Sequence, residues 1–233
     1  MKVVDIVILS DQNNTTEFSA SGEKNLGYLE DHILKTELEN EDLHVLQLSW
    51  DDPDFDWSSA RALIFRSTWD YFYRFQEFFS WLESVSQKCI LINSEALIHW
   101  NLDKHYLNDL EKADVRIADS VFIEKETKTS LQQLFRELGC QEVVIKPCIS
   151  GTARHTYRMN ASTLDHFEPI FQQLIAEEAM ILQPFQYDIV EKGEVSMMLI
   201  DGQFTHAVLK TAKAGDFRVQ DDFGGNVATY SPS

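Results

Sequence analysis

The segment with the most chemical promise reads VVIKPCISGTARHT, at residues 143–156. An apolar run ends in Lys146, and a loop of small residues around Gly151 follows it. A lysine at the end of a buried strand loses hydration, which is unfavourable unless an anion compensates its charge. The loop supplies hydroxyls and a glycine backbone that an anion can approach closely. A hairpin turn with a solvated lysine has the same letters, so the segment alone leaves both interpretations open.

Three other cations occupy similar positions. Lys104 begins a predicted helix, Lys210 ends a predicted strand, and Arg218 follows in the segment GDFRVQDDFGG. Each of them alone is also consistent with a solvated surface residue. Because all stand at the ends of predicted elements in an acid-rich chain, together they indicate an anion site between two α/β layers.

A second candidate site lies in the segment FRSTWDYF, at residues 65–72. It follows a predicted buried strand, and open α/β sheets bind ligands beyond the carboxyl ends of their strands. Arg66 could therefore hold a substrate carboxylate in a two-pronged hydrogen bond, and Asp70 could meet an amine. In the alternative interpretation the aromatic residues simply pack, and Arg66 and Asp70 pair with each other.

The composition argues against several other functions. The 233 residues include 38 acidic and 20 basic side chains, a formal charge of −18, which repels nucleic acids and anionic membranes at long range. Three cysteines without paired spacing argue against a disulfide framework or a zinc site and favour the cytoplasm. The P-loop, dinucleotide, zinc-protease and serine-hydrolase motifs are missing, and no apolar run approaches the ~20 residues of a membrane helix.

The first third of the chain alternates between strand and helix patterns. Strands are predicted at residues 3–9, 43–48, 62–65 and 89–92. Helical spacing relates Leu26, Leu29, Ile33 and Leu34 on one face, and Phe75, Phe78, Phe79, Leu82 and Val85 on another. This βαβ rhythm predicts a parallel α/β domain over residues 1–98.

The remainder, residues 99–233, predicts a mixed α+β domain. Helices are expected over 103–114, 131–138 and 164–174, and strands over 115–123, 142–146 and 179–183. Gly139 is expected to end the second of these helices. A hairpin is expected to turn at Asp201 and Gly202. The chain as a whole is therefore predicted to be of the α/β class, with an α+β second half.

The order of these motifs resembles the ATP-grasp superfamily, which includes glutathione synthetase and many carboxylate–amine ligases. In chain order the matching segments are WNLDKHYL, VVIKPCISGTARHT, MILQPF, KGEVSMMLIDGQFTHAVLK and GDFRVQDDFGGN. The run FRSTWDYFYRF before WNLDKHYL is similar to the branch that contains the O-ureido-serine cyclo-ligase of cycloserine biosynthesis. The resemblance covers almost the whole chain, and it implies a parallel pre-ATP-grasp domain at 1–98 followed by an ATP-grasp nucleotide-binding domain.

The resemblance also implies roles for individual residues. The implied nucleotide site consists of Lys104, Lys146, Ser150, Gly151, Thr152, Arg154, Gln183, Phe185, Glu191, Glu194 and Lys210. The lysines neutralise phosphates, the backbone of residues 150–154 closes over the β- and γ-phosphates, residues 183–185 read adenine, and the glutamates hold the ribose. Arg218 is the catalytic residue that stabilises the acyl phosphate. The implied substrate site consists of Arg66, Ser67, Thr68 and Asp70.

The sequence departs from the family pattern at its end. ATP-grasp enzymes bind magnesium through a glutamate and an asparagine beyond the paired glycines, and no such segment precedes Ser233. Asp221 and Asp222 are too close to Arg218 to replace it. We therefore expect an ATP-grasp domain truncated at its C-terminus, with the Mg²⁺ ligands beyond Ser233 and no metal ligand assigned in this sequence. Exposed apolar residues near 195–210 are then expected, with reduced stability or association, a homodimer included.

The activity implied by the resemblance is an ATP-dependent, amide-forming ligation of a small amino-acid derivative. A substrate carboxylate attacks the γ-phosphate, and a nitrogen then displaces phosphate from the acyl phosphate; in the branch named above the attack closes a ring. Two alternatives stay open. One is a degenerate ATP-grasp protein that binds nucleotide or a partner without turnover, and the other is an α/β protein whose lysines are all solvated.

Overall fold

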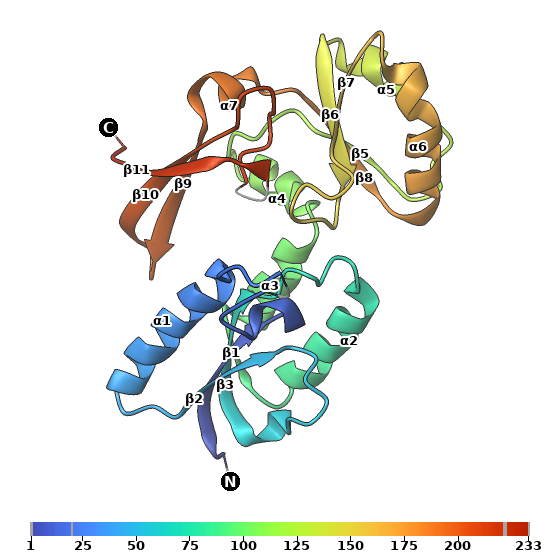
Figure 1. Ribbon diagram of the computed structural model, residues 1–233. Coiled ribbons are helices and arrows are strands. Elements are labelled where there is room, and N and C mark those ends of the chain that lie inside the picture. Colours follow the sequence, from blue (N-terminus) through green and yellow to red (C-terminus); the bar gives the residue numbers. More distant parts are fainter. Residues whose placement is uncertain (1, 20, 221–222, 233) are drawn as a thin grey trace. The chain divides into compact units, whose positions relative to one another are not determined.

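The computed structural model describes residues 2–19, 21–220 and 223–232. The chain divides into two compact units, Met1–Asp103 and Lys104–Ser233. Figure 1 shows the helices and strands of both. Among the described residues, no helix is both long enough and apolar enough to span a bilayer.

The first unit is built on a parallel sheet of four strands. They are β1 (Val4–Ser10), β2 (Val45–Ser49), β3 (Ala60–Ser67) and β4 (Ile90–Ile92), in the order β2-β1-β3-β4. Residues 7–10 of β1 are buried because helices α1 (Leu26–Asn40) and α2 (Phe75–Ser86) lie on opposite sides of the sheet (Figure 1). A third helix, α3 (Glu95–Leu102), and two short 3-10 helices, η1 (Gln12–Asn14) and η2 (Trp57–Ser59), complete the unit. The predicted parallel α/β arrangement is confirmed.

The two main helices of this unit differ in how well their buried faces were predicted. In α2, Phe78, Leu82 and Val85 are buried as expected. In α1 the prediction is wrong for Leu26 and Ile33, which are 62% and 65% exposed. The positions that α1 buries are Gly27 and Asp31, so this helix packs through a residue without a side chain and through a carboxylate.

The second unit begins with a short helix, α4 (Tyr106–Lys112), and contains an antiparallel sheet of four strands. In spatial order these are β5 (Val121–Ile123), β8 (Met180–Pro184), β6 (Glu142–Pro147) and β7 (Tyr157–Asn160). Helices α5 (Leu131–Leu138) and α6 (Leu164–Glu177) pack together on one face and share its core (Figure 1). Gly139 ends α5 in the left-handed conformation, as predicted.

One strand of this sheet is shorter than its sequence suggested. The apolar pattern predicted a strand over residues 115–123, but the regular strand is Val121–Ile123. It pairs with β8 through three residues, from Leu182 to Met180. The earlier residues are not in regular structure, because a β pattern produces a strand only where a neighbouring strand supplies hydrogen bonds.

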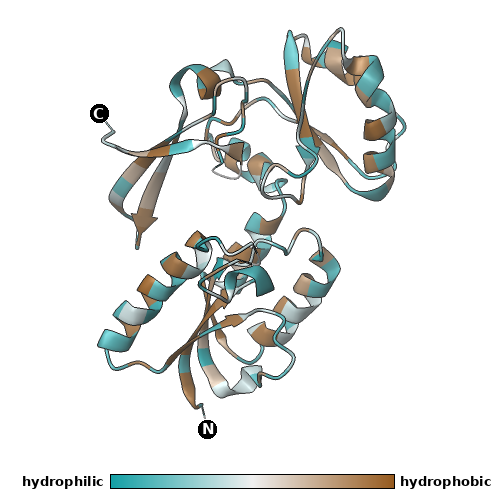
Figure 2. Ribbon diagram, viewed as in Figure 1, coloured by the Kyte–Doolittle hydropathy of each residue, from teal (hydrophilic) through white to brown (hydrophobic). Residues whose placement is uncertain are grey.

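A smaller antiparallel sheet follows helix α7 (Tyr187–Lys192). Its strands are β9 (Glu194–Ile200), β10 (Gln203–Thr211) and β11 (Asn226–Tyr230), in the order β11-β10-β9. The two-residue turn at Asp201 and Gly202 joins β9 to β10, and both residues have positive φ, so the predicted hairpin is confirmed. Figure 2 shows hydrophobic colour along the strands of the two larger sheets, as their burial requires.

Candidate functional site

A cavity of about 380 Å³ lies within the second unit. It is lined by residues from β6, the loop after it, β8, α7, β9 and the segment before β11. The lining consists of Lys104, Val144, Lys146, Ser150, Gly151, Thr152, Ala153, Thr156, Gln183, Pro184, Phe185, Gln186, Ile189, Glu194, Phe217, Arg218, Val219 and Gln220. Nine of the nucleotide-site and catalytic residues proposed from the sequence are among them, while Arg154, Glu191 and Lys210 are not.

Strand alternation places Lys146 in the cavity wall. In β6 the side chains of Val143 and Ile145 are buried in the core shared with α5 and α6. Since neighbouring residues of a strand point to opposite faces, Val144 and Lys146 face the other way and line the cavity. Burial lowers the pKa of Lys146, and the charge of Glu194 partly offsets this effect. The amine is thus desolvated and suited to an anionic partner.

The loop after β6 wraps one side of the cavity and has unusual backbone geometry. Thr152, Ala153 and His155 all have positive φ, between 44° and 56°. Such conformations are costly for residues with a Cβ and are found mostly at functional sites and tight turns. The amide of residue 154 donates to the carbonyl of Gly151, which closes a turn inside the loop.

Two basic side chains hold this loop in place. Lys104 donates from Nζ to the carbonyls of Cys148 and Ser150, at 3.2 and 2.8 Å. Arg154 forms a two-pronged ion pair with Glu178, with Nη1 2.9 Å from Oε1, and it donates from Nη2 to the carbonyl of Ile149. Lys104 therefore lines the cavity while also anchoring the loop, and Arg154 anchors the loop from outside the cavity.

The other side of the cavity is apolar and aromatic. The rings of Phe185 and Phe217 meet edge to face with their centroids 5.8 Å apart. The guanidinium of Arg158 lies 3.7 Å from the centre of the Phe185 ring and is ion-paired with Glu142. This stack fixes the Phe185 ring next to the exit of β8, where residues 183–186 line the same cavity. An apolar slot with aromatic walls suits a flat heteroaromatic ring.

Arg218 lines the cavity but is tightly engaged. Its Nε and Nη2 donate to the carboxylate of Asp216, the latter at 2.6 Å, and its guanidinium carbon lies 3.6 Å from the centre of the Phe223 ring. The hydrogen bonds to Asp216 raise the pKa of Arg218, and those from Arg218 lower the pKa of Asp216. The arginine is thus oriented by its neighbour at the cavity wall.

The acids expected at the ribose separate in the structure. Glu194 lines the cavity, and its Oε1 lies 3.9 Å from Nζ of Lys210, which stands across the hairpin. Glu191, on α7, is exposed and outside the lining. The structure therefore brings Glu194 to the site and leaves Glu191 and Lys210 outside its lining.

The described cavity residues do not suit a magnesium ion. Among those residues, Glu194 is the one carboxylate, and it faces the lysines at positions 146 and 210. Magnesium is usually bound by one or two carboxylates together with phosphate oxygens and waters. Asp216 is committed to Arg218, and Asp221 and Asp222 lie outside the described residues.

In the first unit, the proposed substrate residues lie at the carboxyl end of β3. Arg66 donates from Nε to Asp31, and Ser67 donates from Oγ to the same carboxylate. Thr68 lines a separate cavity of about 340 Å³ with residues of α2 and α3. The alternative interpretation, an ion pair between Arg66 and Asp70, is wrong. Arg66 pairs with Asp31, and Asp70 pairs with Arg74.

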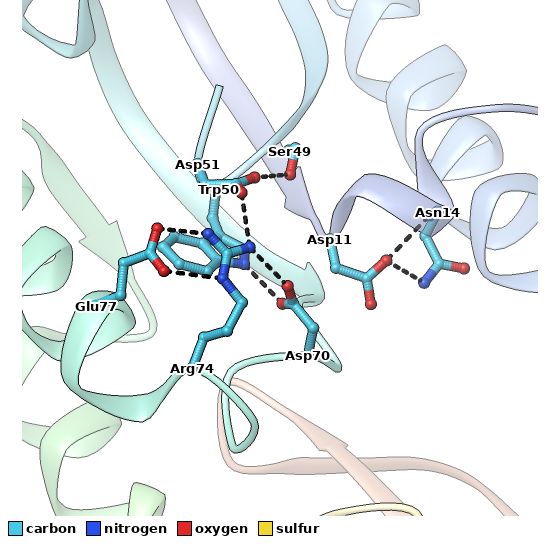
Figure 3. Close-up of polar contacts among 8 residues, drawn as sticks. All are labelled: Asp11, Asn14, Ser49, Trp50, Asp51, Asp70, Arg74 and Glu77. Atoms are coloured by element: carbon cyan, nitrogen blue, oxygen red, sulfur yellow. Dashed lines mark hydrogen bonds and ion pairs between the residues drawn. The ribbon is translucent and has the colours of Figure 1, made fainter. Parts of the chain in front are cut away.

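Figure 3 shows the partners of Asp70. Its carboxylate accepts a hydrogen bond from Nε1 of Trp50 at 2.7 Å and from Nη1 of Arg74 at 3.1 Å. Arg74 also pairs with Asp51 and Glu77, which raises its pKa. Asp70 thus belongs to a network that ties the ends of β2 and β3 to α2, and its role toward a substrate amine stays a prediction.

Comparisons with known proteins found a matching family model and similar proteins. Residues 6–93 match the family described as D-cycloserine synthetase DcsG, N-terminal domain. The chain is 29% identical over 167 residues to the cycloserine biosynthesis protein DcsG of Streptomyces lavendulae, an alignment that covers 70% of this chain and 56% of that protein. The chain thus spans about half the length of the curated relative that it matches.

Two solved structures are similar over nearly the whole chain. The crystal structure of D-cycloserine synthetase DcsG matches with a TM-score of 0.82 and 23% identity, over 98% of this chain and 75% of that one. A D-alanine–D-alanine ligase from Bacillus anthracis, solved in complex with ATP, matches with a TM-score of 0.60 and 13% identity, over 99% and 72%. The protein therefore has the ATP-grasp fold, with a parallel α/β domain at its N-terminus. Within that fold, residues 6–93 match the N-terminal-domain family of DcsG, and the chain is similar to DcsG itself.

Several cavity residues were missed by the sequence analysis. Val144, Ile189 and Phe217 form apolar walls, and Gln186 and Gln220 add polar groups. The alternation along β6 could have indicated Val144, since it shares a face with Lys146. The others carry no local signal, because their positions depend on how α7 and the segment before β11 fold back.

Proposed function

We propose that this protein is an ATP-dependent ligase that joins a carboxylate to a nitrogen nucleophile. The observation that carries the proposal is the cavity of the second unit, which pairs a desolvated lysine and a strained loop with an aromatic slot. One end suits a polyphosphate and the other suits a nucleobase. The similarity to an ATP-complexed ligase supports ATP as the nucleotide.

The nucleotide residues have defined roles in this proposal. Lys146 and Lys104 neutralise the phosphates, and the backbone of residues 150–154 closes over them. The backbone around Gln183 and Phe185 reads adenine, and Glu194 holds the ribose. Cations and backbone donors of this kind account for most of the rate enhancement in phosphoryl transfer, which depends on positioning and charge stabilisation.

The proposed chemistry proceeds in two displacements. A carboxylate oxygen of the substrate attacks the γ-phosphorus, the bond to the β–γ bridging oxygen breaks, and ADP leaves. The nitrogen nucleophile then attacks the acyl carbon, loses a proton, and expels inorganic phosphate. Arg218, at the cavity wall, would stabilise the charge on the acyl phosphate and on the tetrahedral species that follows.

The proposal also covers the substrate class, the metal ion and the cellular compartment. We propose a small amino-acid derivative as the substrate, because the relatives' names point to small amino acids. Magnesium would accompany ATP, although we assign it no ligand among the described cavity residues. The three cysteines without paired spacing favour a cytoplasmic protein, and the formal charge of −18 argues against binding to nucleic acid or membrane.

A protein that binds nucleotide without turnover is the second candidate. The engagement of Arg218 by Asp216 and the unsuitable magnesium environment favour it. Calorimetry with MgATP tests both candidates on the wild type and on Lys146→Ala. A charge-assisted contact is worth about 1.5–3 kcal/mol, so the variant should bind roughly 10- to 100-fold more weakly.

Turnover then separates the two candidates. Release of ADP that depends on an added amino acid supports the ligase. Binding of MgATP without ADP release across a panel of amino acids would favour the non-catalytic protein. If neither the wild type nor Lys146→Ala binds MgATP, both candidates are wrong.

A further inference from the structure

Asp31 is a fully buried carboxylate in the first unit that the sequence pattern did not single out. Its exposed fraction is 0%, and it lies on α1, one helical turn after Gly27. A buried carboxylate is strongly unfavourable unless it is paired and hydrogen-bonded. Both of its oxygens are satisfied: Nε of Arg66 lies 2.9 Å from Oδ1, and Oγ of Ser67 lies 2.8 Å from Oδ2.

A β-bulge makes this double contact possible. In the pairing of β1 with β3, Leu9 is opposite Phe65 and Ser10 is opposite Ser67, so Arg66 is an extra residue. In a regular strand the neighbours Arg66 and Ser67 would point to opposite faces. The bulge redirects them so that both reach one carboxylate, and bulges of this kind often re-aim side chains beside binding sites.

The packing of α1 is built to bring Asp31 to this position. A Cβ at Gly27 would lie 2.6 Å from Oδ1 of Asn14 and 3.2 Å from the ring of Trp69. The missing side chain therefore lets the helix approach the loops that follow β1 and β3. The helix contributes Asp31 one turn further along the same face.

The arrangement commits one side of the Arg66 guanidinium and leaves the rest available. Nη2 forms an ion pair with the exposed Glu30 at 3.7 Å, without a hydrogen bond, and Nη1 has no hydrogen-bond partner among the residues that the structure describes. The side chain is 40% exposed although its Nε is bonded to a buried group. It stands at the carboxyl end of a parallel strand, where open sheets bind ligands.

We propose that Asp31 is a positioning residue that holds Arg66 to bind the carboxylate of a small amino acid. This inference rests on the proposed function, because it specifies how the ligase holds one substrate. Arg66 and Asp31 together are neutral, and Glu30 adds a negative charge, so recognition depends on hydrogen-bond geometry rather than on net charge. A lysine at position 66 should therefore not replace the arginine.

The test measures binding rather than turnover, with probes that differ in one group. D-alanine and L-alanine are compared with their amides, which lack the carboxylate, on the full chain. The ¹⁵N–¹H signal of Arg66 Nε reports directly on the contact with Asp31. The variants are Asp31→Asn, Arg66→Lys and Arg66→Gln, and the matched control is Glu37→Gln, an exposed acid-to-amide change on the same helix.

The proposal expects an alanine enantiomer to shift the Arg66 signal while its amide does not. Arg66→Gln and Arg66→Lys should weaken alanine binding about tenfold or more, the loss of one charge-assisted contact. Asp31→Asn should weaken it several-fold and remove the protection of the Nε proton, while Glu37→Gln should change neither. Melting curves identify any variant that fails to fold. In that case Arg66→Lys, which keeps the positive charge, is the one variant compared with the wild type.

Three results would overturn the proposal. The first is an amide that binds as well as the acid, and the second is a folded Asp31→Asn protein with unchanged alanine affinity, which would make the pair purely structural. The third is a wild type that binds neither enantiomer. MgATP binding measured in the same samples reports on the second unit, so the proposed function can stand when this inference fails.

Discussion

The buried amine of Lys146 both destabilises the folded state and suits the cavity to an anion. Its strand needs apolar residues on the core face, and the alternation of β6 turns the lysine to the cavity instead. Burial lowers its pKa, so the amine loses its charge at a lower pH than a solvated lysine would. The folded state therefore carries the cost of desolvation, which a bound phosphate would offset.

From the desolvation of Lys146 we predict how the free energy of unfolding depends on pH. Between the lowered pKa of Lys146 in the folded state and its ordinary value near 10.4, the unfolded chain binds more protons, so stability rises with pH in that window. Urea unfolding at pH 8 and pH 10 should show the wild type gaining stability relative to Lys146→Met, which cannot titrate. MgATP affinity of the wild type should fall over the same range.

Lys125→Met is the control for this experiment. Lys125 is exposed and lies in the same unit, so removing it should leave the pH dependence of stability as in the wild type. If Lys146→Met and the wild type change in parallel between the two pH values, Lys146 is not desolvated in the folded protein.

At the scale of elements, the junction between α7 and β9 decides where Glu194 lies. Gly193 has φ +87°, and a Cβ there would lie 2.6 Å from the carbonyl oxygen of Lys210 and 2.9 Å from Leu209. The absence of a side chain lets β10 approach this turn. That approach places Glu194 across the hairpin from Lys210, at the edge of the cavity.

Two glycine substitutions compare an open turn with a crowded junction. Gly202 also has positive φ, +72°, but a Cβ there would meet nothing within 4 Å. Gly202→Ala should therefore cost only the left-handed conformation, about 1–2 kcal/mol of unfolding free energy. Gly193→Ala should cost a further ~1–3 kcal/mol, measured by urea unfolding, because its φ of +87° and ψ of −178° suit glycine almost alone and because its Cβ would clash. Equal losses in the two variants would show that β10 does not need the close approach.

At the scale of the whole molecule, the small sheet leaves apolar side chains in water. On β9, Val195, Met197 and Leu199 share one face and are 42%, 55% and 59% exposed, as the sequence predicted for this region. Contiguous apolar surface of this kind tends to mark an interaction site or to cause association. The formal charge of −18 opposes association at low ionic strength.

Self-association should therefore increase with both protein concentration and salt. Light scattering coupled to gel filtration should show a larger mass at high salt, where charge repulsion is screened. Met197→Thr combined with Leu199→Thr should return the protein to a monomer, whereas Ile33→Thr, at an exposed apolar residue of α1 in the first unit, should not. A wild type that stays monomeric under all conditions would contradict the prediction.

The sequence predicted most strands and helices because their signals are local. Helical spacing identified the buried residues of α2, the Asp–Gly turn identified the hairpin, and Gly139 marked the end of α5. It failed on α1, where apolar Leu26 and Ile33 are exposed and Asp31 is buried. A carboxylate can occupy a buried position only when partners from elsewhere satisfy it, and helical periodicity carries no information on those partners.

What the sequence by itself determined is the fold class, the order of its elements and the residue types available for a phosphate site. Local propensity and the order of motifs were enough for that. Only the tertiary structure decided which cations reach the cavity. Lys146 lines its wall, whereas Arg154 is ion-paired with Glu178 and Lys210 lies outside the lining, next to Glu194. The reason is physical, because a charged side chain takes the partners that the folded chain brings within hydrogen-bond distance, and those partners are remote in sequence.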